Sequence, residues 1–188
     1  MTSGIIEKSN NGLFDNEIEI NGKYATMARF LKEDVGIFAT FREAYLTAAI
    51  IGLLNNAKET KDTSEKVQAA SIFPNELSKR KADLKLIYRI IMLVEENPDY
   101  TIEDYMNRAF RDDAEEGNRD KLKANMALFN SYACGGLEVL YNKFQNLSKT
   151  DDIVDALYDY IHSFGVDVGL LDEEDALPDF EIEDNKRP

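Results

Sequence analysis

Residues 40–54 read TFREAYLTAAIIGLL, and this stretch decides the fold. Thr40 followed three residues later by Glu43 is the capping-box signature of a helix start. The residues behind it are apolar on almost every side, which is typical of a helix buried at the centre of a domain. Neighbouring helices can approach it closely because one side carries three small residues: Ala48, Ala49 and Gly52.

The longest helical pattern in the chain spans residues 118–147. Apolar residues recur there at spacings of three and four, as on one face of a helix. Gly135 and Gly136 interrupt the pattern, and each glycine costs about 1 kcal/mol in a helix interior. The pair therefore marks either a kink or a close helix crossing. The apolar positions are Leu122, Met126, Phe129, Ala133, Leu137, Leu140, Phe144 and Leu147.

Shorter patterns complete an all-α prediction, an irregular helical bundle of about five to six helices. Asn21-Gly22 is also a hairpin signal, but the spacing of the residues after it favours a helix preceded by an extended lead-in at 17–20. We expect a short arm at 1–16, a helical domain at 17–165 and an acidic segment at 166–188. Further helices are expected at 23–33, 64–70, 75–97, 101–111 and 150–165, with Thr101–Asp104 as a capping box, Thr150 as the last N-cap and Gly165 as its terminator.

The charge balance limits the partners of this chain. The formal net charge is −14 and the pI is about 4.5, so direct nucleic-acid binding by phosphate neutralisation is not expected. A basic partner surface is favoured. The longest apolar run, residues 44–54, is about half of the ~20 residues that a membrane span needs. With one cysteine and no signal-peptide pattern, we expect a cytoplasmic protein.

Catalytic and metal-binding patterns are missing from the sequence. Cys134 lies among small residues, which favours a structural thiol over a nucleophile paired with the single histidine, His162. There is no CxxC, HExxH or phosphate-binding glycine motif. Residues 112–117 resemble a calcium loop, but the required oxygen ligands are absent at two positions. We expect no cofactor, no metal and no enzymatic activity.

A basic edge stands out in this acidic chain. It consists of Lys81, Lys85 and Arg89, which share one helix face at four-residue spacing. One interpretation is a solvated helix edge paired with nearby carboxylates. The other is a docking site for an anion, including the acidic segment of the same chain.

The acidic segment holds half of the excess charge. From Gly165 to Pro188 there are nine acidic residues and two basic ones, which gives −7. Apolar residues lie among the acids, as in segments that order on a basic, grooved partner. The alternative is that these residues fold back onto the bundle. The contact residues predicted here are Leu170, Leu171, Asp172, Glu173, Glu174, Asp175, Phe180 and Glu181.

One stretch resembles a known class of proteins. Residues 38–53 read FATFREAYLTAAIIGL and are similar to a helix in small accessory proteins of bacterial DNA-modification and phage-defence loci. The resemblance covers about a tenth of the chain. It implies an accessory role and carries no catalytic residues.

These observations predict a non-enzymatic accessory or regulatory protein that binds a protein partner with a basic surface. A homo-oligomer is left open. The alternatives are an acidic inhibitor or DNA mimic that occupies a nucleic-acid site on a partner, an accessory subunit of a phage-defence or DNA-modification system, and an enzyme that uses carboxylates alone.

Overall fold

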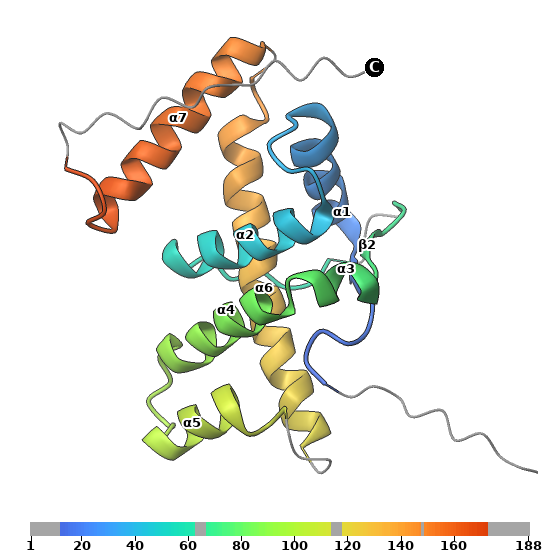
Figure 1. Cartoon of the computed structure of the whole chain (residues 1–188), viewed down its shortest axis with the longest axis vertical. Coiled ribbons are helices and arrows are strands. Elements are labelled where there is room, and N and C mark those ends of the chain that lie inside the picture. Colours follow the sequence, from blue (N-terminus) through green and yellow to red (C-terminus); the bar gives the residue numbers. More distant parts are fainter. Residues whose placement is uncertain (1–11, 63–66, 114–117, 148, 173–188) are drawn as a thin grey trace, which may run out of the picture. The chain divides into compact units, whose positions relative to one another are not determined.

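The structure is a computed structural model of the 188-residue chain and describes residues 12–62, 67–113, 118–147 and 149–172. The chain divides into two compact units, Met1–Asn142 and Lys143–Pro188. The described residues form seven α-helices and one small two-stranded sheet, which confirms the all-α prediction (Figure 1). In order, the elements are β1 (Ile18–Ile20), α1 (Gly22–Arg29), the π-helix η1 (Phe30–Asp34), α2 (Phe41–Leu54), β2 (Ala70–Ile72), α3 (Pro74–Lys79), α4 (Lys81–Val94), α5 (Ile102–Phe110), α6 (Arg119–Phe144) and α7 (Thr150–Asp167).

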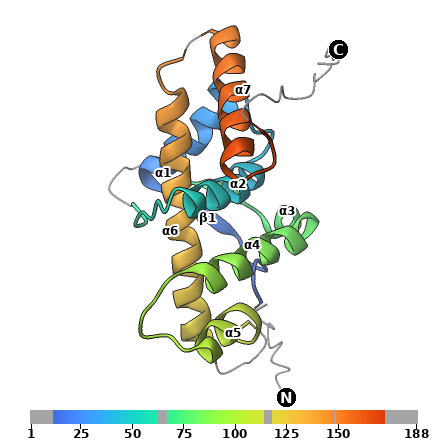
Figure 2. The same cartoon turned by 90° about the vertical axis from the view of Figure 1, so that its left-hand side faces the viewer.

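The first unit is built around the crossing of α2 and α6 (Figures 1 and 2). A Cβ placed on Gly136 would lie 1.8 Å from the carbonyl oxygen of Ala48, and one placed on Gly52 would lie 2.0 Å from the carbonyl oxygen of Tyr132. Only glycine fits at either position. Helix α6 continues unbroken through both of its glycines, so of the two interpretations the close crossing is confirmed.

An aromatic cluster lies in the core of this unit. The ring centroid of Phe129 lies 5.5 Å from those of Phe14 and Tyr45 and 6.3 Å from that of Tyr88. Phe14 and its neighbour Leu13 are buried. The described end of the expected arm, residues 12–16, therefore differs from the prediction, because the two apolar side chains insert into the core.

The two strands correct one helix prediction. Residues 70–72 form β2, which pairs antiparallel with β1, and Ile18 lies opposite Ile72. The short helix expected at 64–70 is wrong for its described part, since residues 67–69 are not helical. The extended lead-in at 17–20 is confirmed as β1. Gly22, with a φ of 59°, begins α1 instead of turning a hairpin.

The single helix expected at 75–97 is two helices. Arg80 leaves the helical conformation (φ −130°, ψ 27°) and separates α3 from α4. Its side chain pairs with Asp83 at 2.7 Å in the first turn of α4. Apolar spacing could not reveal this break, because buried Leu77 and Leu84 are seven residues apart, which is also two turns of a continuous helix. The capping boxes of Thr40–Glu43 and Thr101–Asp104 are confirmed.

The second unit contains α7 and the start of the acidic segment. The N-cap of α7 is Lys149 instead of the predicted Thr150, which is the first helical residue, so the helix begins one residue earlier than predicted. The helix also passes through Gly165, which is buried, and ends before Gly169 at a φ of 71°. Along α7, Leu157 and Phe164 are half-buried, whereas Val154 and Ile161 are exposed.

Candidate functional site

The basic edge is largely paired within its own unit. Lys81 forms an ion pair with Asp15, and Lys85 pairs with Asp113 at 3.2 Å. The guanidinium carbon of Arg89 lies 5.3 Å from the centroid of the Phe110 ring. The structure therefore favours the paired helix edge over an open docking site for an anion at Lys81 and Lys85.

The acidic segment is described only as far as Asp172, which is exposed. Leu171 folds back onto α7, where its N–H donates to the carbonyl oxygen of Gly165 at 3.1 Å. A Cβ on Gly165 would lie 2.5 Å from the Leu171 side chain, so the two residues are in direct contact. Leu170, in contrast, is 77% exposed. The other predicted contact residues lie outside the described residues: Glu173, Glu174, Asp175, Phe180 and Glu181.

Helix α4 carries a second apolar stripe that faces solvent. Its first stripe, at Leu84, Tyr88 and Ile91, is fully buried. The second lies at positions 86, 90 and 93, spacings of four and three residues that align side chains along one side of a helix. Leu86 is 55% exposed, and the next two members are also exposed: Ile90 and Leu93.

Helix α5 also carries an exposed apolar stripe. Ile102, Met106 and Phe110 follow one another at four-residue spacing, and all three are exposed, with Ile102 at 84%. Helices α4 and α5 pack against each other, and the Phe110 ring lies against Arg89 of α4, three residues from Leu86. We call the six residues of the two stripes the α4–α5 apolar surface. Apolar groups scattered singly on a surface are ordinary, whereas large apolar patches are typical of interaction sites.

The sequence contained a signal for this surface. In α4 the apolar residues are too many for one face, since the stripes beginning at Leu84 and Leu86 lie on opposite sides of the helix. That excess indicates either a helix buried on all sides or a helix with an exposed apolar face. Only the packing around α4 distinguishes the two.

A buried polar network fixes α5 against α6. Arg108 Nε donates to Asn125 Oδ1 at 2.9 Å, and Asn125 Nδ2 donates to Asp112 Oδ2 at 3.0 Å. Asp112 and Asn125 are almost fully buried. The Tyr88 hydroxyl donates to the Arg108 carbonyl at 3.1 Å, and burial raises the pKa of Tyr88 to about 12. These contacts orient the α5 side of the apolar surface.

Cys134 lacks the surroundings of a nucleophile. Burial raises the pKa of its thiol to about 12, so the reactive thiolate is scarce at neutral pH.

Within the described ranges, no group of three His, Cys, Asp or Glu side chains is placed to hold a metal ion. No helix in the described part of the chain is long and apolar enough to cross a membrane. Neither a protein-family model, a curated protein sequence nor a solved structure matches this chain.

Proposed function

We propose that this chain is a non-enzymatic accessory or regulatory protein that acts by binding another protein. The observation that supports this function is the α4–α5 apolar surface. Burial of apolar side chains contributes about 25 cal/mol per Å² removed from water, so these six exposed side chains on two packed helices supply a substantial driving force for association. Protein interfaces have an apolar centre of this kind and a polar rim.

The charge of the chain defines the partner. A net charge of −14 repels acidic proteins and speeds association with basic ones. Glu103 follows Ile102 directly and Asp99 precedes it by three residues, and both carboxylates are exposed. The partner therefore presents an apolar groove with basic residues along its edge. The acidic segment supplies a second contact to the same basic surface.

The test is a comparison of three baits in an extract of the source cells. The wild-type chain is compared with the double variant Leu86→Ser/Met106→Ser and with Val154→Ser, a control that removes an exposed apolar side chain of α7. We expect a protein retained by the wild type and the control but lost with the double variant. Purified components should then show at least a tenfold loss of affinity. Retention by all three baits would contradict the proposal.

Two further measurements test whether the acidic segment contributes to binding and whether the partner is a second copy of this chain. Truncation after Asp172 should weaken the complex if the acidic segment contributes, and unchanged affinity would reject that contribution. Sedimentation of the purified chain measures its oligomeric state and so tests whether a second copy binds to the apolar surface. A dimer that Leu86→Ser converts to a monomer would assign the apolar surface to self-association instead of a different protein.

The net charge also supports a second candidate, an acidic inhibitor that mimics DNA. Such a protein should displace duplex from a DNA-binding partner, and the displacement should fade as salt rises, because salt screens exposed charges. Competition that is insensitive to salt would count against mimicry and favour the apolar contact.

A further inference from the structure

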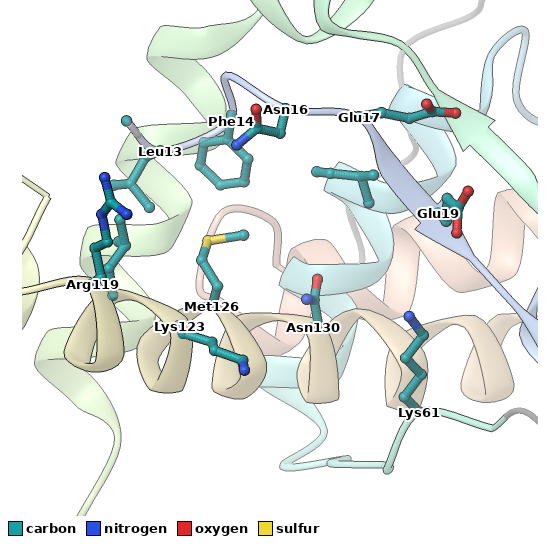
Figure 3. Close-up of a pocket in the computed structure, with 13 residues that line it drawn as sticks. Leu13, Phe14, Asn16, Glu17, Glu19, Lys61, Arg119, Lys123, Met126 and Asn130 are labelled. Atoms are coloured by element: carbon teal, nitrogen blue, oxygen red, sulfur yellow. The ribbon is translucent and has the colours of Figure 1, made fainter. Parts of the chain in front are cut away.

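A cavity of about 410 Å³ lies in the first unit between residues 12–19 and the N-terminal half of α6 (Figure 3). Sites for small organic ligands have volumes of roughly 300–1,000 Å³. The cavity shares no lining residue with the α4–α5 apolar surface, so it is separate from the proposed protein contact.

One wall of the cavity is a face of α6. Arg119, Lys123, Met126 and Asn130 line it, and their spacings of four, three and four residues place them along one side of the helix. The wall therefore begins with two cations, continues with an apolar thioether and ends with an amide. Figure 3 shows these side chains in that order along the helix.

The opposite wall is held in place by the core. Phe14 lines the cavity, and its ring also packs edge-on against Phe129, with the centroids 5.5 Å apart, and against Tyr88, at 6.4 Å. Its backbone has a φ of 62°, which a bulky residue adopts only when its surroundings hold it there. The apolar part of the cavity is therefore formed before any ligand arrives.

The charges in the cavity are divided between its two ends. Arg119 and Lys123 lie at one end, and Figure 3 shows Glu17 and Glu19 with Lys61 toward the other. None of the ion pairs among the described residues involves Arg119 or Lys123. Both belong to the first turns of α6, where the helix dipole also favours an anion. In a chain of net charge −14, this end of the cavity is a local exception.

We propose that the cavity binds a small organic anion with an apolar body. Its phosphate or carboxylate group lies between Arg119 and Lys123, since guanidinium and ammonium groups donate charge-assisted hydrogen bonds to such oxygens. Its apolar body lies against Phe14 and Met126. Hydroxyl or amine groups at its far end meet the carboxylate of Glu17.

The experiment titrates the ¹⁵N-labelled full chain with four probes and follows backbone amide shifts. Phenyl phosphate and phenylacetate carry both an anionic group and an apolar body. Inorganic phosphate lacks the body, and benzyl alcohol lacks the charge. We expect at least one of the first two to shift the amides of Phe14, Lys123 and Met126, with an affinity at least tenfold above that of the last two. The better of the two identifies the anionic group.

Variants then locate the site. Arg119→Gln/Lys123→Gln should reduce the affinity at least tenfold, and Met126→Trp should block binding by filling the apolar part. Lys121→Gln is the matched control, because Lys121 is an exposed cation of α6 that does not line this cavity. All the replaced charges are exposed, so the fold should be retained, as circular dichroism would verify. The proposal is overturned if neither aromatic anion binds at millimolar concentration, if inorganic phosphate or benzyl alcohol binds equally well, or if Lys121→Gln is as damaging as the double variant.

Discussion

Gly52 and Gly136 meet at the crossing of α2 and α6, where a Cβ added to Gly136 would lie 2.8 Å from the backbone nitrogen of Gly52. The atoms in the way are backbone atoms of a buried helix and cannot move aside as a flexible side chain would. The contact thus sets how closely the two central helices of the first unit approach.

Gly136→Ala should destabilise the chain, although helix propensity alone would make alanine stabilising by about 1 kcal/mol. We expect a loss of about 3 kcal/mol, because the new methyl group forces the helices apart in a packed core. Urea unfolding followed by circular dichroism measures it. Gly36→Ala is the control: its φ is 77° and no atom lies within 4 Å of the new Cβ, so only the backbone strain of about 1–2 kcal/mol remains. A Gly136→Ala protein as stable as the wild type would refute the close crossing.

Asn125→Ala should cost about 3 kcal/mol, because it removes the bridge between Arg108 and Asp112 and takes the amide donor from Oδ2 of the buried Asp112 carboxylate. The matched control is Asn107→Ala, in which the lost side-chain contact is the exposed hydrogen bond from Arg111. It should cost less than about 1 kcal/mol in the same unfolding measurement. Equal costs for the two variants would show that the network does not hold α5.

Glu95 should make stability depend on acid pH. Burial alone would raise the pKa of this carboxyl, but hydrogen bonds from the Tyr132 hydroxyl and from Lys58, at 2.9 Å, outweigh it and lower the pKa below its ordinary value. A lowered folded-state pKa contributes stability that is fully present above the unfolded pKa, about 4.3 for a glutamate, and is lost as the pH falls through the folded value. The stability difference between wild type and Glu95→Gln should therefore be largest near pH 6 and shrink toward pH 3.

Two variants check the origin of this effect. Tyr132→Phe removes one donor to Glu95, so it should flatten the pH dependence of stability. Glu96→Gln, at the exposed neighbouring position, should change stability at pH 6 by less than about 0.5 kcal/mol. A wild type and a Glu95→Gln variant that differ equally at pH 6 and pH 3 would rule out the ionised Glu95 as the source.

Cys134 should react slowly with a disulfide reagent at pH 8 while the chain is folded, because burial raises the pKa of the thiol to about 12. In urea the thiol regains its ordinary pKa of about 8.5. We expect labelling about 100-fold faster in urea, since both the thiolate fraction and the access increase. Rapid labelling of the folded chain would reopen the question of a nucleophilic role.

Local signals in the sequence determined the ends of several helices and the helical class. The capping boxes at Thr40 and Thr101 and the apolar spacing of residues 118–147 depend on neighbours within one or two turns, and the structure confirms them. The Gly135–Gly136 pair indicated either a kink or a close crossing, and only the tertiary structure decided between the two.

The tertiary structure decided the strand pairing, the break between α3 and α4, and which apolar side chains are covered, because the spacing of residues along the chain does not determine these features. The partner of Ile18 is Ile72, more than fifty residues away, and the break at Arg80 leaves the apolar period of its helices intact. Burial of Leu13 and Phe14 created one wall of the cavity, and packing left Leu86 exposed while it buried Leu84. A pattern of apolar residues shows that a side chain can be buried. Whether another element covers it depends on contacts between residues distant in sequence, and those contacts formed both the apolar surface and the cavity.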